Sequence, residues 1–272
     1  WPYMHAEISI AALEAGKHVL TEARMAMNLK EAEKMLKAAE AHPKLVAQIV
    51  PAPFSLKYDA TIARMLAEGK LGDIREIRVT HLVGANSDPT VPLIWRQNTK
   101  FSGKNIMTMG ILYETVQRWL GDVDIEWVQA LGRGFTPERE DPETGEMAPV
   151  EIPDTISLTA GYPDGSQLRM TLSSIATGSS YLGIRIDGSK ASLQYDFGDQ
   201  QLYKADVGKG HKALVKAPVR EQGSWQVEKD FIASIREGKP VCLTSFADGV
   251  RYMRFTERVW DSWTHSGKRV KW

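Results

Sequence analysis

The sequence predicts an α/β protein in which a parallel layer is followed by an α+β domain with a large, mostly antiparallel sheet. Three observations carry this prediction. Helix-like and strand-like segments alternate over residues 1–50, strand-length segments separated by turn residues follow from about 123 to 220, and helical patterns return at the end. The 272 residues suffice for two modest domains, which we place at 1–50 and 51–272.

The first part is expected to form helix, strand, helix and strand in that order. Residues 5–15 have a helical composition and end at Gly16, and HVLTE has the length of a short strand. Asn28, with Glu31 three residues later, predicts the start of a second helix, which Pro43 closes. The apolar run 45–50 is typical of a strand buried on both faces. This order predicts that the two strands are parallel.

The second part is expected to begin with a short helix at 58–66 and a strand over about 74–83. A long helix is predicted over 106–120. Turn signals such as DPETGE, YPDGSQ and DGSK then divide residues 123–220 into the strands of an antiparallel sheet. Helices at about 224–237 and 248–264 end the chain, and the second has an apolar residue every three or four positions.

Charge and cysteine content exclude several classes of protein. The 34 basic residues balance 34 acidic ones, so no global field favours nucleic acid or an acidic membrane surface. The single cysteine, Cys242, excludes an intramolecular disulfide and a Cys-rich zinc site, and it fits a reducing, cytoplasmic setting. No apolar run approaches the ~20 residues that cross a bilayer. No set of His, Asp or Glu has the spacing of a metal site.

Four stretches carry a resemblance to a known family. They are PYMHAEISIAALEAGKHVLTE with MAMNLKEAEKM, then GKLGDIREIRV, then WRQNTKFSGKNIMTMGILYETVQRWLG, and finally the segment from DFIASIREGKPV to GKRV. The chain resembles the glucose-fructose oxidoreductase, inositol dehydrogenase and MocA (Gfo/Idh/MocA) family from end to end. The resemblance implies NAD or NADP as cofactor, a sugar-like small molecule as substrate, and a homo-oligomer formed through an open sheet face.

The resemblance also implies that the parallel layer is an incomplete Rossmann-type one. Family members have a glycine-rich turn on the first strand, where the pyrophosphate approaches a helix N-terminus. The one G-x-G-x-x-A match, at Gly208, Gly210 and Ala213, has polar flanks and no following helix, which favours a hairpin turn. By this comparison Trp1 follows the fourth strand of the nucleotide-binding half. We therefore expect the chain as given to bind NAD poorly or not at all.

Two positions differ from the family's proton-transfer residues. Where the family has Glu-Lys-Pro after this strand, the chain has Glu22, Ala23 and Arg24. Where the family has Asp-x-Gly-x-His on the long helix, the chain runs from Thr108 to Leu112. Alanine and leucine transfer no proton, and arginine stays protonated at neutral pH, although its planar fork suits a carboxylate or phosphate. Losing acid–base assistance costs about 10² to 10⁴ in rate, so the ordinary dehydrogenase mechanism requires another group.

Two hypotheses of function follow. The first is an NAD(P)-dependent oxidoreductase for a sugar, polyol or related molecule; the second is a family member without redox chemistry, either a lyase or isomerase or a non-catalytic binding or assembly subunit. The candidate catalytic residues are Lys104, which stands where the family has glycine, Tyr113 and Glu114. By resemblance, the candidate cofactor-binding residues are Glu22, Arg24, Trp95 and Arg96.

Overall fold

A computed structural model describes residues 1–272, and it begins with a small parallel layer. Helix α1 (Pro2–Glu14), strand β1 (Val19–Thr21), helix α2 (Leu29–Ala41) and strand β2 (Ala47–Ile49) follow one another. β1 and β2 pair in parallel, with Val19 opposite Ala47. The predicted order and direction are therefore confirmed. The Asn28 side chain accepts a hydrogen bond from the Glu31 N–H at 3.0 Å, as expected of the residue that caps α2.

The second layer is one sheet of nine strands in the order β12-β11-β10-β9-β3-β8-β7-β4-β13. β3 (Ile74–Leu82) lies near its middle and pairs in parallel with β8 and antiparallel with β9. All other pairs in this sheet are antiparallel, which confirms the predicted sheet. The other strands are β4 (Trp127–Arg133), β7 (Thr155–Gly161), β8 (Gln167–Ser173), β9 (Tyr181–Gly188), β10 (Ala191–Asp196), β11 (Gln201–Asp206), β12 (Ala213–Leu214) and β13 (Val270–Lys271).

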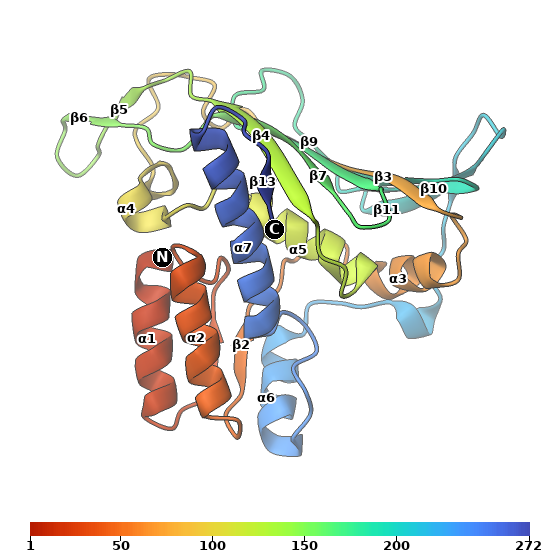
Figure 1. Ribbon diagram of the computed structural model, residues 1–272, viewed down its shortest axis with the longest axis horizontal. Coiled ribbons are helices and arrows are strands. Elements are labelled where there is room, and N and C mark those ends of the chain that lie inside the picture. The colour runs from red at the N-terminus through yellow and green to blue at the C-terminus, as the bar shows by residue number, and fades with distance from the viewer.

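Helices cover one face of this sheet. Figure 1 shows α3 (Asp59–Ala67) and α5 (Met109–Leu120) beneath the strands, with α7 (Phe246–Thr264) running from the sheet down towards α2. One continuous hydrophobic core joins Met35 of α2 to Met253 of α7 and Leu158 of β7. α7 therefore packs against both layers, and the division at residue 50 stays a prediction.

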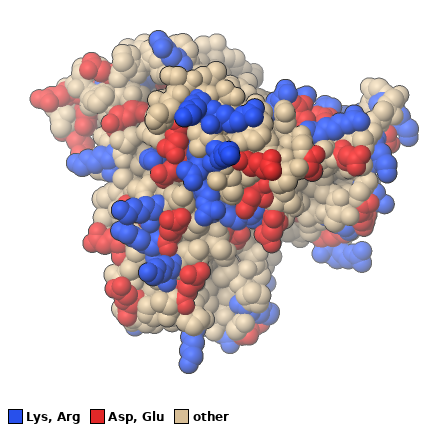
Figure 2. Space-filling view, in the orientation of Figure 1, with Lys and Arg blue, Asp and Glu red and all other residues tan.

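The other face of the nine-stranded sheet is polar. Arg78 on β3, Arg169 on β8 and Arg185 on β9 project from it, and their guanidinium groups form ion pairs with Glu76 and Asp187. Both signs of charge are also interspersed over the face of the molecule shown in Figure 2. The centre of the open sheet face thus carries matched charges, whereas Leu131 on β4 and Tyr181 on β9 are exposed apolar side chains.

The remaining elements connect these layers. They are the 3-10 helix η1 (Trp95–Gln97), the short helix α4 (Thr99–Ser102), a hairpin of β5 (Glu138–Glu140) and β6 (Met147–Pro149), the 3-10 helix η2 (Val219–Glu221) and helix α6 (Val227–Glu237). The DPETGE turn joins β5 to β6, as its sequence indicates. No helix is both long and apolar enough to cross a membrane.

Candidate functional site

The segment after β1 brings Arg24 towards the second layer. The Met25 N–H donates a hydrogen bond to the Tyr252 hydroxyl of α7 at 2.5 Å. The ring of His5, on α1, donates from Nδ1 to the Arg24 carbonyl oxygen at 2.9 Å. The backbone around Arg24 is thus held from both sides, whereas Glu22 stays exposed. The predicted cofactor residues Glu22 and Arg24 consequently differ in environment: the first faces solvent and the second is buried.

The Arg24 side chain lies against the first turn of α5. A Cβ added at Gly110 would lie 4.0 Å from the Arg24 Cδ and 3.4 Å from the Tyr252 ring. Only 6% of the surface of Arg24 is exposed, and its Nε has no hydrogen-bond partner. Burial, followed by the nearby charge of Arg96, lowers the pKa of Arg24 to about 10. Arg24 therefore stays charged at neutral pH without any compensating group in the protein.

A histidine reaches the same turn of α5 from the sheet. The His81 Nδ1, on β3, lies 2.7 Å from the Thr108 hydroxyl, and Thr108 is the N-cap of α5. Burial lowers the pKa of His81 below its ordinary value of 6.5. Both residues are only partly buried. An imidazole that is neutral at pH 7 therefore contacts the position where the family has the aspartate of Asp-x-Gly-x-His.

The predicted pair Trp95 and Arg96 forms η1, and Arg96 is near enough to Arg24 to disfavour its charge. The Arg96 guanidinium lies over the Trp95 ring, 4.2 Å from its centroid, and the Trp1 ring stacks on Trp95 with centroids 5.3 Å apart. Arg96 is exposed and has no carboxylate within 4.0 Å. We call Arg24, His81, Arg96, Thr108 and Gly110 together the α5 site.

Lys104 lies between α4 and α5 in the sequence, and its side chain contacts α7. Its Nζ is 2.6 Å from a Glu257 carboxylate oxygen and 3.8 Å from one of Asp261, both on α7. The positive φ of Gly103 and the contact of that glycine with Met27 bring Lys104 to this place. The amine is therefore held in an ion pair, and a catalytic role for Lys104 stays a prediction.

Tyr113 and Glu114 are both buried within the core. The Tyr113 ring stacks on Phe255 at a centroid distance of 3.8 Å, and its hydroxyl has no partner. Burial raises the pKa of Tyr113 well above its ordinary value. Glu114 accepts hydrogen bonds from the Ala52 N–H at 3.0 Å and the Thr244 hydroxyl at 2.6 Å. Neither contact tests a catalytic role, so both assignments stay predictions.

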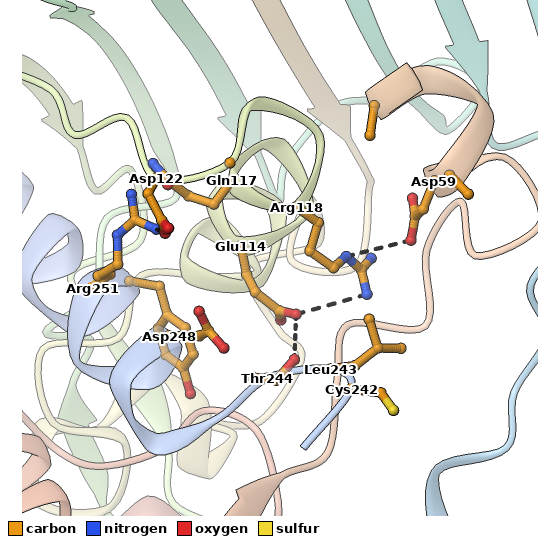
Figure 3. Close-up of a pocket in the computed structure, with 14 residues that line it drawn as sticks. Asp59, Glu114, Gln117, Arg118, Asp122, Cys242, Leu243, Thr244, Asp248 and Arg251 are labelled. Atoms are coloured by element: carbon orange, nitrogen blue, oxygen red, sulfur yellow. Dashed lines mark hydrogen bonds and ion pairs between the residues drawn. The ribbon is translucent and has the colours of Figure 1, made fainter. Parts of the chain in front are cut away.

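Glu114 borders a cavity of about 320 Å³ between α3, α5 and the start of α7. Figure 3 shows Arg118 between Asp59 and Glu114, with nitrogen–oxygen distances of 3.4 and 3.7 Å. Neither Arg24 nor His81 lines this cavity, although Tyr252 does. The cavity is therefore lined by charged side chains that pair with one another, such as Arg118 with Asp59 and Glu114.

Ala23 and Leu112, which replace the family's proton-transfer residues, differ in burial. Leu112 has no exposed surface, whereas Ala23 is partly buried against the core. A leucine at the position of the family's histidine is buried in the core, because burial of an apolar side chain stabilises the folded state. The partly exposed side of this helix end is formed by Thr108 and His81 instead. In the sequence His81 is a single histidine within the strand predicted over about 74–83, and only its contact with Thr108 makes it a candidate site residue.

The residues present fit one end of NAD(P). Glu22 is exposed just beyond the carboxyl end of the parallel strand β1, where nucleotide ligands bind in such sheets, and Arg96 supplies an exposed cation. Gly208 and Gly210 lie in the exposed turn between β11 and β12, which confirms the hairpin prediction. Residues 1–272 hold no other candidate glycine-rich turn, and no group of His, Cys, Asp or Glu suited to a metal ion.

Comparisons with known sequences identify a family for both layers. Residues 1–49 match the sequence model described as an oxidoreductase family with an NAD-binding Rossmann fold, and residues 60–194 match the GFO/IDH/MocA C-terminal domain. Levoglucosan dehydrogenase of Pseudarthrobacter phenanthrenivorans is 24% identical over 96% of this chain and 75% of its own length. Inositol 2-dehydrogenase 3 of Saccharopolyspora erythraea is 28% identical over 60% of this chain and 48% of its own length.

Solved structures share the fold. An oxidoreductase domain protein from Kribbella flavida superimposes with a TM-score of 0.85 at 27% identity, covering 99% of this chain and 78% of that one. An inositol dehydrogenase homolog from Azotobacter vinelandii, complexed with NAD⁺, gives 0.83 at 21% identity, covering 100% and 76%. The NAD-binding Rossmann description of the matched N-terminal segment supports NAD or NADP as the cofactor. The chain belongs to the Gfo/Idh/MocA family of oxidoreductases.

Proposed function

We propose that this chain belongs to an NAD(P)-dependent oxidoreductase that interconverts a hydroxyl and a carbonyl group on a sugar, a polyol or a related small molecule. The observation that carries the proposal is the contact between His81 and Thr108 at the start of α5. It provides a titratable group one helical turn before Leu112, which together with Ala23 replaces the family's own proton-transfer residues. The similarity to levoglucosan and inositol dehydrogenases supports the class of substrate.

The cofactor, when bound, accepts or donates the hydride of the reaction. Glu22 and Arg96 are the residues that would lie beside its nicotinamide end, with Trp95 fixing the orientation of Arg96 through a cation–π contact. The remaining requirement is a group that takes the hydroxyl proton as the substrate is oxidised. Neither Ala23 nor Leu112 can meet this requirement.

His81 can meet it. In the tautomer in which Nδ1–H donates to the Thr108 hydroxyl, Nε2 carries a free lone pair and can accept a proton. Its lowered pKa keeps the ring neutral at pH 7, which is the form that a general base needs. On oxidation the substrate's hydroxyl proton passes to Nε2, and on reduction the same nitrogen returns it. The Thr108 hydroxyl has the lone pairs to accept from Nδ1–H, as that tautomer requires.

The test is made on the protein expressed from its complete reading frame. NADH and NADPH binding are measured by fluorescence titration, and turnover is measured on a panel of sugars and polyols with His81→Gln beside the parent. We expect cofactor affinity to be unchanged and kcat/KM to fall about 10² to 10⁴-fold. His211→Gln, at an exposed position, is the control and should leave both quantities unchanged.

A non-redox function is the second candidate, because two residues that the family uses for proton transfer are absent at Ala23 and Leu112. It covers a lyase or isomerase that uses Lys104, Tyr113 or Glu114, and a non-catalytic binding or assembly subunit. The same titration separates the two candidates. No binding of either dinucleotide to the complete protein would remove the dehydrogenase proposal and leave the non-redox one.

We further propose a cytoplasmic homo-oligomer that associates through the open sheet face. The alternating charges of Arg78, Glu76, Arg185 and Asp187 offer pairs that a second copy can match. The exposed free thiol of Cys242 is consistent with a reducing compartment. Light scattering after size exclusion tests the oligomer, and Arg185→Glu should shift the mass towards the monomer. An unchanged mass for this variant would place the interface elsewhere.

A further inference from the structure

Two arginines are buried in this protein, and only one of them has acceptors. Arg139 donates hydrogen bonds to the carbonyl oxygens of Asp88, Val91 and Asn86 at 2.7 to 2.9 Å. Arg24 is almost as deeply buried, yet its side chain donates no hydrogen bond and has no carboxylate within 4.0 Å. A buried charge without a partner costs several kcal/mol, so such groups are normally paired or bind a ligand.

The surroundings of Arg24 add positive potential. Arg96 is close enough to disfavour the charge of Arg24, and neither guanidinium has an acidic neighbour. The first turn of α5 lies beside the Arg24 side chain, and the unpaired N–H groups of a helix N-terminus favour negative charge. Two neighbouring cations therefore have no acidic partner in the protein, and one of them, Arg24, lies beside a helix N-terminus.

We propose that the Arg24 guanidinium binds a carboxylate of the substrate, so that the substrate is an acidic sugar of the uronate or aldonate class. The inference rests on the proposed function for the rest of the substrate, because the sugar-like part is taken from it. Arg24 replaces, in this chain, the proline that the family has next to its catalytic lysine. The replacement adds a specificity-determining cation where the family's substrates meet the protein.

The direction of the side chain assigns Arg24 to the substrate rather than to the nucleotide. The residues beside its stem, Gly110 and Tyr252, belong to α5 and α7. Both helices lie beyond the parallel layer, in the part of the chain that carries the large sheet. Glu22, by contrast, stays exposed at the end of β1. Arg24 is therefore assigned to the substrate, and Glu22 to the nucleotide.

A carboxylate suits this place better than a phosphate. The two terminal nitrogens of one guanidinium form two parallel hydrogen bonds to the two oxygens of a planar carboxylate. A Cβ at Gly110 would lie 3.2 Å from the Thr256 Oγ1, 3.4 Å from the Tyr252 ring and 4.0 Å from the Arg24 Cδ, so the stem of Arg24 is closely packed and its terminal nitrogens are the ones left to meet a ligand. A dianionic tetrahedral phosphate needs donors on several sides, and Arg24 supplies one fork only.

Matched pairs of ligands test the inference on the complete protein with saturating NADH. Binding is measured by calorimetry for D-glucuronate against D-glucose, D-galacturonate against D-galactose, and D-gluconate against D-glucitol, each pair differing at one carboxylate. We expect an acid of this panel to bind about tenfold or more tightly than its neutral partner. Arg24→Gln should reduce that ratio to less than about threefold and leave the affinity of the neutral partner unchanged. Lys30→Gln, an exposed cation, is the control.

The outcomes separate this inference from the proposed function. Cofactor binding without a preference for any acid overturns the acidic-sugar inference and leaves the oxidoreductase proposal standing. A preference for acids that is lost in Arg24→Gln, without cofactor binding, supports the inference and overturns the proposal. Tighter binding of glucose 6-phosphate than of every carboxylate would show that the anion is a phosphate, and it would overturn the inference. A preference that survives in Arg24→Gln overturns it as well, because the carboxylate then binds elsewhere.

Discussion

The Nδ1 of His81 and the hydroxyl of Thr108 lie 2.7 Å apart, so a strand near the middle of the large sheet touches the first turn of the helix that crosses it. The two residues are 27 positions apart in the sequence, so the contact depends on the tertiary fold. It also fixes which nitrogen of the imidazole remains available for proton transfer. The pH dependence of the reaction follows from this arrangement.

Oxidation of substrate should be lost on acidification. His81 acts as a base only when neutral, and burial lowers its pKa below 6.5, so the rate is at its plateau at neutral pH and falls as pH drops through that lowered pKa. The profile of log kcat/KM against pH should therefore have an acidic limb with its midpoint below 6.5. In His81→Gln the limb should vanish together with most of the activity. An unchanged limb in this variant would assign it to another group.

Replacement of two arginines by methionine should have opposite effects on stability. Arg24→Met removes a buried charge without a partner and should raise the free energy of unfolding by about 1 kcal/mol or more. Arg118→Met leaves Asp59 and Glu114 without their cation and should lower it by about 3 kcal/mol. Urea unfolding in a buffer without carboxylates measures both. A loss of stability in Arg24→Met would mean that the charge has a partner within the protein.

Glu114 should make the fold less stable as pH rises. Burial raises the pKa of its carboxyl above the ordinary 4.5, so the folded state keeps a proton that the unfolded state has already lost. The contribution of Glu114 to the free energy of unfolding is complete below its ordinary pKa of 4.5. It declines as pH rises through the raised pKa of the folded state. Glu114→Gln should remove this decline above pH 4.5 in thermal unfolding. An equal decline in the variant would exclude Glu114 as its source.

Replacement of Lys104 distinguishes a structural ion-pair role of its amine from a catalytic role. Its Nζ is held by Glu257 at 2.6 Å, and both side chains are partly exposed. From this geometry we expect Lys104→Met to keep kcat within about threefold and to cost less than about 1 kcal/mol of stability. Steady-state kinetics and unfolding of this variant provide the measurement. A drop of about 100-fold in kcat without a change in stability would support the catalytic assignment instead.

Most of the fold could be predicted because local patterns determine it. Asn28 and Glu31 marked the start of α2, and the DPETGE turn marked a hairpin. The start of α5 was predicted at Ile106, three residues too early. Met107 adopts a positive φ of 45° and Thr108 is the N-cap, and neither residue type signals such a break. The short strand β13 also lacked a signal, because two residues carry no periodicity.

The candidate site was harder to predict, since burial and long-range contacts decide it. The sequence showed that Ala23 and Leu112 replace the usual proton-transfer residues, but it could not show that Leu112 is wholly buried. Nor could it show that His81 meets Thr108, because the pairing of β3 sets that distance. For Arg24 the residue type indicated an anion, while the absence of any protein acceptor required the structure.

The place of β3 between β8 and β9 has a consequence for how this molecule assembles. Ile77 has Leu168 on one side and Ile186 on the other, so the strand is completed only after a long stretch of chain has been synthesised. Pairings between such distant segments form slowly, because loop closure costs entropy before contacts repay it. We therefore expect His81 to reach Thr108 late on the folding pathway. Refolding experiments that follow catalysis and sheet formation together should find that both return in the same slow phase.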